Sequence, residues 1–208
     1  MEASFSQPLI LNITGQKVAL GPLRRDLLPL YLRWVNDFEV TRTMGIGWRP
    51  TTLEAEEAWY ESVAKADNSP MFTLYERETL HPIGTTGLHG VDHFHRTAEL
   101  GLMIGEKECW GQGYGTEAVR LMLDYGFHGQ ALHNILARVL SSNMRGFRAL
   151  QRAGFQEFGR AREAVRFGGR SYDTIYMDCL STEFESPVLL PLIDRLVGSP
   201  VEVPHVQP

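Results

Sequence analysis

The chain of 208 residues has few cysteines, no excess of positive charge and no long apolar run. Its two cysteines, Cys109 and Cys179, are too few for a disulfide framework or a zinc site, and we expect no bound metal. The formal net charge of -5 argues against general affinity for the backbone of nucleic acids, which requires a basic surface. No stretch approaches the ~20 apolar residues that span a membrane, and Met1–Pro8 lacks the basic start and apolar centre of a secretory signal. These absences predict a cytoplasmic protein without a nucleic-acid or membrane partner.

The overall composition is typical of a globular protein, with 43% hydrophobic and 22% charged residues. The length is sufficient for one domain with a substantial core. We expect an N-terminal arm over residues 1–16, this domain over 17–180, and a proline-rich tail over 181–208 that lies outside the main core.

The spacing of apolar residues predicts the order of the secondary structure. Helical spacing predicts helices over 24–35, 52–66, 118–127 and 142–153, with a short helix or turn over 36–43. Apolar alternation predicts strands over 17–22, 71–76, 83–93, 97–104, 133–140, 155–164 and 171–180. This order predicts an α+β fold around one mixed, mostly antiparallel sheet of about seven strands.

A glycine-rich segment separates the predicted strand over 97–104 from the helix that follows it. Its sequence is Trp-Gly-Gln-Gly-Tyr-Gly-Thr-Glu-Ala over residues 110–118. The first backbone N–H groups of a helix are unpaired, and the helix dipole makes that end partly positive. Because glycines carry no Cβ atom to keep an anion away, Gly111, Gly113 and Gly115 are placed to hold a phosphate or pyrophosphate. We expect Thr116 to cap the helix.

Other readings of this segment are less consistent with its surroundings. Three glycines alone can simply form a flexible turn. A P-loop would end in Gly-Lys-Ser/Thr, and a dinucleotide fingerprint needs a third glycine at a different spacing. Neither pattern is present in the sequence.

The sequence resembles the GNAT superfamily of acetyltransferases, and within it the RimJ/RimL-like branch. Three segments carry the resemblance in the expected order. They are Leu-Gly-Pro-Leu-Arg-Arg-Asp-Leu-Leu-Pro over 20–29 with Trp-Val-Asn-Asp over 34–37, the stretch over 99–118, and Asn-Met-Arg-Gly-Phe-Arg-Ala-Leu-Gln-Arg-Ala-Gly-Phe over 143–155. The resemblance implies a sheet that opens in the middle, flanked by helices.

The resemblance also implies acetyl-CoA as co-substrate and an amine as acceptor. Its pyrophosphate would lie on the glycine loop, and its pantetheine arm would pair with the preceding strand. The residues carried over by position are Leu102, Met103, Ile104, Trp110, Gly111, Gln112, Gly113, Tyr114, Gly115, Thr116 and Asn143. The acceptor would be a protein N-terminus or a small-molecule amine, and related proteins occur as monomers and homodimers.

The sequence departs from the family pattern at two positions. Trp110 stands where Gln or Arg usually begins the phosphate motif, so pyrophosphate binding would rest on backbone N–H groups. Leu150 stands where many members have a tyrosine that protonates the CoA thiolate. A thiolate is a good leaving group, because thiols have an ordinary pKa near ~8.5.

Glu99 is the first candidate for a general base. An aliphatic amine has an ordinary pKa near ~10.4 and must lose a proton before it attacks the thioester. Glu99 begins the strand expected to approach the thioester, and it shares a face with Gly101 and Met103. A solvated carboxylate or a structural partner of an arginine would fit this position equally well.

Histidines near the same strand are further candidates. His93, in the turn before the strand, has the residue type suited to proton transfer at neutral pH, and an exposed hairpin residue is the alternative reading. His89, inside the preceding strand, could instead face the acceptor cleft.

Two functions from different classes therefore remain. The first is an acetyl-CoA-dependent N-acetyltransferase in which the amine attacks the thioester directly. The second is a CoA-binding regulatory module with little turnover, which only Leu150 supports. A nucleotide-binding protein is a third reading, but the lysine or ribose-binding acid that it needs is missing.

Overall fold

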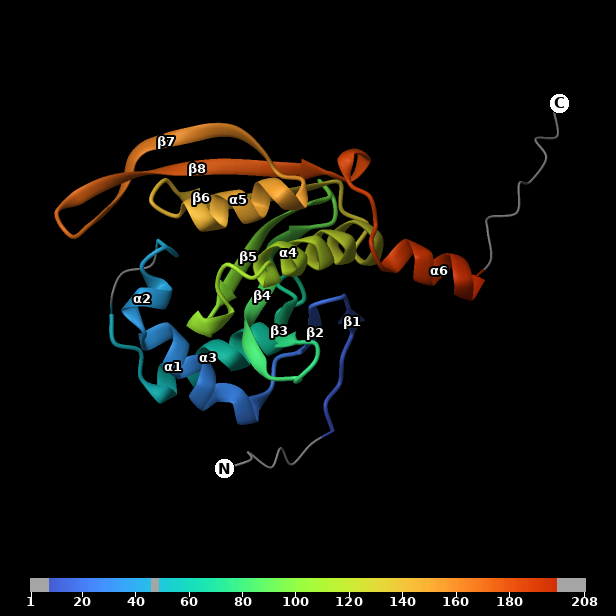
Figure 1. Cartoon of the computed structure of the whole chain (residues 1–208), viewed down its shortest axis with the longest axis horizontal. Helices are drawn as coiled ribbons and strands as arrows, with labels where there is room; N and C mark the ends of the chain where they lie inside the picture. The colour runs from blue at the N-terminus through green and yellow to red at the C-terminus, as the bar shows by residue number, and fades with distance from the viewer. Residues whose placement is uncertain (1–7, 46–48, 198–208) are drawn as a thin grey trace.

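The structure is a computed structural model of the chain, and it describes residues 8–45 and 49–197 (Figure 1). Its centre is one eight-stranded sheet in the order β1-β2-β3-β4-β5-β6-β8-β7. The strands are β1 (Ile13–Thr14), β2 (Val18–Pro22), β3 (Met71–Glu76), β4 (Pro82–Asp92), β5 (Thr97–Ile104), β6 (Asn134–Leu140), β7 (Gln156–Phe167) and β8 (Arg170–Leu180). All neighbours are antiparallel except β5 and β6. The predicted α+β fold with one mixed sheet is confirmed.

The sheet has one strand more than the seven that the sequence predicts. The additional strand, β1, lies within the predicted N-terminal arm and pairs Ile13 with Leu20 of β2. It is two residues long, too short to produce an alternating pattern in the sequence. Ile13 is nevertheless buried in the core, which ties this part of the arm to the sheet.

The helices follow the predicted order, with shifts of a few residues at their ends, and one helix that was not predicted, α6, lies in the expected proline-rich tail. They are α1 (Leu28–Asn36), α2 (Phe38–Thr41), α3 (Leu53–Ala64), α4 (Tyr114–Asp124), α5 (Met144–Ala153) and α6 (Leu189–Val197). Short 3-10 turns, η1 (Arg25–Leu27), η2 (Lys107–Cys109) and η4 (Ser181–Glu183), and one π-helical turn, η3 (Tyr125–Gly129), adjoin them. No helix in the described ranges is both long enough and apolar enough to cross a membrane.

The core lies on both faces of the sheet because neighbouring residues of each strand point in opposite directions. On β3, Leu74 packs with Met122 of α4 in the larger cluster. The next residue, Tyr75, packs on the other face with Tyr31 and Trp34 of α1. Helices α4 and α1 therefore cover opposite faces of the sheet.

The sheet opens between β5 and β6. Their parallel pairing joins Thr97–Glu99 to Asn134–Leu136, whereas β5 continues to Ile104 and β6 to Leu140. Figure 1 shows the two strands behind α4 and α5. The predicted opening in the middle of the sheet is confirmed, and it exposes the backbone edge of the second half of β5.

The first part of the C-terminal tail is fastened to α4. The buried carboxylate of Asp124 accepts hydrogen bonds from Ser186 Oγ at 2.6 Å, from the backbone N–H of Val188 at 2.9 Å and from that of Leu189 at 2.8 Å. Nδ1 of His128 lies 2.8 Å from the same carboxylate. Beyond this anchor α6 extends away from the sheet (Figure 1). The domain limits at 17 and 180 stay a prediction.

Candidate active site

The glycine-rich turn leads directly into α4. Gly111 and Gly113 have φ values of +78° and +92°, in the left-handed region that favours glycine. Gly113 is the N-cap residue, and the first helical hydrogen bond runs from Glu117 N–H to its carbonyl at 3.1 Å. The N–H groups before Glu117 are therefore available to an anion. The predicted capping role of Thr116 is wrong, because the left-handed glycine lets α4 begin at Tyr114 and places Thr116 inside the first turn.

A cavity of about 330 Å³ opens beside this turn and the free edge of β5. All the residues that the sequence predicts to hold the cofactor line it, except two. Those lining it are Leu102, Met103, Ile104, Trp110, Gly111, Gly113, Gly115, Thr116 and Asn143. The two exceptions, Gln112 and Tyr114, turn to other partners: the Gln112 carbonyl accepts from Lys17 Nζ at 2.9 Å, and the Tyr114 hydroxyl bonds to Glu76. That bond to Glu76 raises the pKa of Tyr114 to about 12.

Asn143 stands at the other side of the cavity, where it begins α5. Its Oδ1 accepts a hydrogen bond from the N–H of Gly146 at 2.9 Å. Its side chain therefore caps the helix, as Asn commonly does. The residue also lines the second cavity described below.

Trp110 fixes the start of the turn to the end of β5. Its indole Nε1 donates to the carbonyl of Ile104 at 2.9 Å. The guanidinium of Arg145 lies over the ring, 3.9 Å from its centroid, which is the geometry of a cation–π contact. Loss of solvent around that guanidinium lowers the pKa of Arg145, and the nearby Arg42 lowers it further.

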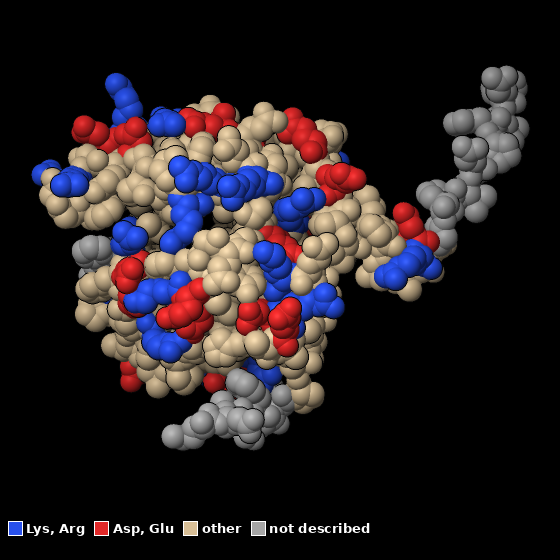
Figure 2. All heavy atoms as spheres, in the orientation of Figure 1, with Lys and Arg blue, Asp and Glu red and all other residues tan. Residues whose placement is uncertain are grey.

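A row of arginines forms the α5 wall of the same cavity. Arg145, Arg148 and Arg152 are spaced by three and four residues, so they lie on one face of the helix, and all three line the cavity. Figure 2 shows Lys and Arg side chains gathered over α5. The cavity therefore combines backbone N–H groups on one side with positive side chains on the other, which suits a ligand that carries several phosphates.

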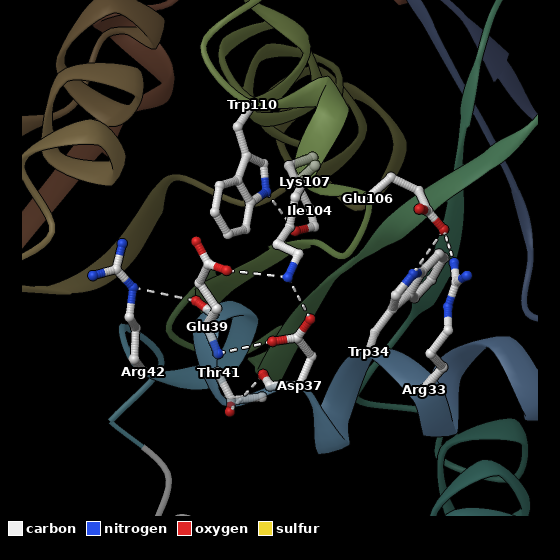
Figure 3. A network of polar contacts seen from close by, with 10 residues as sticks. All are labelled: Arg33, Trp34, Asp37, Glu39, Thr41, Arg42, Ile104, Glu106, Lys107 and Trp110. Atoms are coloured by element: carbon white, nitrogen blue, oxygen red, sulfur yellow. Dashed lines mark hydrogen bonds and ion pairs between the residues drawn. The ribbon is translucent and has the colours of Figure 1, made fainter.

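The corner between α1 and α2 is tied to the segment that follows β5 (Figure 3). Lys107 Nζ lies between Asp37 Oδ2 at 2.9 Å and Glu39 Oε2 at 3.0 Å. The hydrogen bond from Lys107 holds the pKa of the Asp37 carboxyl below its ordinary value. Glu106 accepts from Trp34 Nε1 at 3.0 Å and also pairs with Arg33. These contacts hold the chain after α2, which contributes Thr43 and Met44 to both cavities.

A second cavity, of about 460 Å³, adjoins the first at Leu102 and Asn143. Glu99 lines it, and Glu99 Oε1 accepts from Arg138 Nε at 2.6 Å. Both readings of Glu99 therefore remain open, since it faces a cavity and also pairs with an arginine. Leu150, at the position of the family's tyrosine, is buried in the core and lines the same cavity.

His89 is the histidine that lies beside Glu99. The two residues are directly opposite on β4 and β5, and both line the second cavity. The imidazole lies over Gly101, where an added Cβ would be 2.7 Å from Nε2. His93 is exposed in the turn after β4 and lines neither cavity. The structure therefore brings His89, and not His93, next to Glu99.

Sequence reasoning missed several residues of the site. Arg138 and the arginines of α5 are the clearest cases, and only the parallel pairing of β5 with β6 would have indicated Arg138. Residues 46–48, which follow the part of the chain that contributes Thr43 and Met44 to the cavities, fall outside the described ranges.

Comparison with known proteins agrees with this geometry. A family model described as an acetyltransferase (GNAT) domain matches residues 17–156. The chain belongs to the GNAT acetyltransferase family. The acetyltransferase is 26% identical over 171 residues to the "uncharacterized N-acetyltransferase p20" of Bacillus licheniformis, covering 81% of this chain and 96% of that protein. It is 31% identical over 160 residues to the human alpha/beta-tubulin-N-acetyltransferase 9, covering 70% of this chain and 75% of that protein.

A solved structure confirms the fold of this GNAT acetyltransferase. The spermidine N-acetyltransferase of Vibrio cholerae, crystallised with CoA and spermine, superposes with a TM-score of 0.75 at 23% identity. The match covers 80% of this chain and 97% of that one. At this level of identity the likeness concerns the fold alone.

Proposed function

We propose that this GNAT acetyltransferase takes acetyl-CoA as its co-substrate and transfers the acetyl group to a primary amine. The observation that carries the proposal is the position of the glycine turn. The N–H groups at the start of α4 and the free edge of β5 open into one cavity, and the cavity that contains Glu99 adjoins it. This arrangement suits an elongated ligand whose diphosphate lies at the start of α4 and whose thioester reaches the cavity that contains Glu99.

The first cavity offers groups suited to the diphosphate, the pantetheine arm and the remaining phosphate of acetyl-CoA. Gly113, Gly115 and Thr116 offer backbone N–H groups to the diphosphate at the positive end of α4. The second half of β5, unpaired with β6, offers its backbone to the amides of the pantetheine arm, as in the addition of a strand. The arginines of α5 add positive charge for the remaining phosphate.

The reaction proposed at the second cavity is a direct transfer. The amine nitrogen attacks the thioester carbonyl carbon, a C–N bond forms, and the C–S bond breaks to release the CoA thiolate. A backbone N–H of β5 would stabilise the negative charge that develops on the carbonyl oxygen. The amine nitrogen gives up its proton to the carboxylate of Glu99, directly or through a water molecule. His89, directly opposite, is the alternative acceptor of that proton.

The acceptor, the RimJ/RimL-like branch, the cytoplasmic location and the homodimer stay predictions. Protein and small-molecule amines are both consistent with the comparisons, since one relative is named for tubulin and one neighbour for spermidine. A screen of amines and peptides with acetyl-CoA, read by mass spectrometry, tests the function. We expect a mass increase of one acetyl group on an acceptor with a free primary amine. CoA binding without transfer to any acceptor would favour the regulatory module that Leu150 suggests.

A further inference from the structure

The hairpin of β1 and β2 contacts the glycine-rich turn and the start of α4 through residues that do not line the first cavity. The carboxylate of Glu117, in the first turn of α4, accepts from the backbone N–H groups of Gln16 and Lys17, the latter at 2.7 Å. Gly15 makes this approach close, since an added Cβ would lie 2.6 Å from Glu117 Oε1. Residues about a hundred positions apart are therefore held together at the start of α4.

The side chain of Lys17 reaches the turn itself. Its Nζ donates to the carbonyl oxygen of Gln112 at 2.9 Å. A Cβ added to Gly113 would lie 3.3 Å from the same nitrogen. Gly113 lines the first cavity, and Lys17 is outside the set of described residues that line it. The ammonium group therefore lies behind the turn.

The geometry of the peptide group connects this contact to the cavity. The C=O of Gln112 and the N–H of Gly113 belong to one planar trans peptide, so they point in opposite directions. A cation that holds the carbonyl on the outer side directs the N–H toward the inner side. We propose that Lys17 is a positioning residue that acts through Gln112 to aim the Gly113 N–H at the diphosphate of the co-substrate. The inference rests on the proposed function.

Charge gives Lys17 a second effect on the same ligand. Residues 110–119 contain no Lys or Arg and one carboxylate, that of Glu117, so the positive potential of this segment comes only from its backbone N–H groups. The arginines of α5 lie across the cavity, and Lys17 adds a full positive charge on the side of the turn. An anion at the turn is attracted by this charge without direct contact.

The test compares Lys17→Met, Lys17→Arg and Lys65→Met in the full chain. Lys65 follows α3, is largely exposed and pairs only loosely with Glu61, so its variant is a control for the loss of one positive charge. We expect Lys17→Met to bind CoA about fivefold more weakly in titration calorimetry, the scale of an exposed ion pair. Lys17→Arg should retain most of the affinity, and Lys65→Met all of it.

Kinetics with a truncated co-substrate separates positioning from a general structural effect. Lys17→Met should raise the KM for acetyl-CoA about fivefold and leave kcat nearly unchanged. With acetyl-pantetheine, which has no diphosphate, the variant and the wild type should have equal kcat/KM. Equal CoA affinity of Lys17→Met and wild type would overturn the inference, as would an equal loss with acetyl-pantetheine. A wild-type protein without affinity for CoA would overturn the proposed function as well.

Discussion

The two adjoining cavities are built in different ways. The first depends mainly on the backbone of one continuous segment, from the second half of β5 through the glycine turn to the start of α4, with α5 as its far wall. The second depends on side chains from β4, β5 and β6 and from the chain after α2, among them His89, Glu99 and Arg138. Under the proposed function, this division separates the binding of a constant co-substrate from the recognition of an acceptor.

The difference lies in which changes each cavity tolerates. A backbone site is insensitive to most side-chain replacements but depends on the few glycines that give it its shape. A side-chain site can be altered one residue at a time without loss of the fold. We therefore expect substitutions in the two cavities to act on different measured quantities, affinity for CoA in the first and turnover in the second.

The largest effect is expected from Gly113→Asp, which should abolish measurable binding of CoA. The added Cβ lies 3.3 Å from Lys17 Nζ, so the new carboxylate competes with the Gln112 carbonyl for Lys17 and adds a negative charge at the start of α4 that repels the diphosphate. Calorimetry measures the affinity, and thermal unfolding shows that the variant folds.

Gly168→Asp is the matched control for this substitution. Gly168 also has a positive φ, +56°, but it lies in the turn between β7 and β8 with no atom within 4 Å of an added Cβ. It should lose a similar amount of stability and retain its CoA affinity. If the Gly113→Asp variant bound CoA as tightly as the wild type, the glycine-rich turn would not be the phosphate-binding site.

The next effect concerns the second cavity. Glu99→Gln should lower kcat about 100-fold, the scale of a lost general base, and leave the affinity for CoA unchanged. Steady-state kinetics with the acceptor found in the screen measures both quantities. Glu157→Gln is the control, because Glu157 also pairs with an arginine, Arg160, at 2.6 Å, but on β7. An unchanged kcat in Glu99→Gln would leave Glu99 as the structural partner of Arg138.

A smaller effect is expected from the thiol of Cys109, which lines the first cavity. Burial raises its pKa, and Glu76, Glu106 and Glu108 raise it further. Iodoacetamide should therefore label it slowly at neutral pH and faster as the pH rises, because the thiolate is the reactive form. Saturating CoA should slow this labelling several-fold, as followed by mass spectrometry.

Cys179 serves as the internal control for the same experiment. It is fully buried, and burial raises its pKa to about 12, so it should stay unlabelled in the folded protein. Labelling of Cys109 at the same rate with and without CoA would place the co-substrate elsewhere.

The smallest effect is expected from the arginine row. Arg148→Gln should weaken CoA binding about threefold, since an exposed charge contributes little in water, and the loss should shrink as salt is added. Arg162→Gln, on β7 and outside both cavities, is the charge-matched control. Equal affinity of Arg148→Gln and wild type at low salt would show that α5 does not contact the phosphates.

The same contrast explains what the sequence could predict. Most of the predicted cofactor residues could be proposed from the sequence because the glycines, the strand before them and the helix after them form one local pattern, and the structure places nine of the eleven around the first cavity. Even there the start of α4 was placed too late, since only the φ of Gly113 shows that the helix begins at Tyr114. The strand β1 was missed because two residues give no periodicity.

The contacts of the second cavity could not be predicted, because they join distant parts of the chain. Arg138 meets Glu99 only through the parallel pairing of β6 with β5. His89 was one of several histidines until the register placed it opposite Glu99. Lys17 reaches Gln112 across 95 positions, and no local pattern indicates such a contact. Side-chain sites of this kind follow from the assembled sheet rather than from any one segment.

Amide hydrogen exchange measured by NMR, with and without CoA, tests most directly whether the backbone at the start of α4 holds the diphosphate. The N–H groups of Gly113, Gly115 and Thr116 precede the first helical bond, so they should exchange quickly in the free protein. We predict that saturating CoA slows their exchange more than that of any amide in the turn between β7 and β8. Bound CoA with unchanged exchange at these three residues would contradict the account.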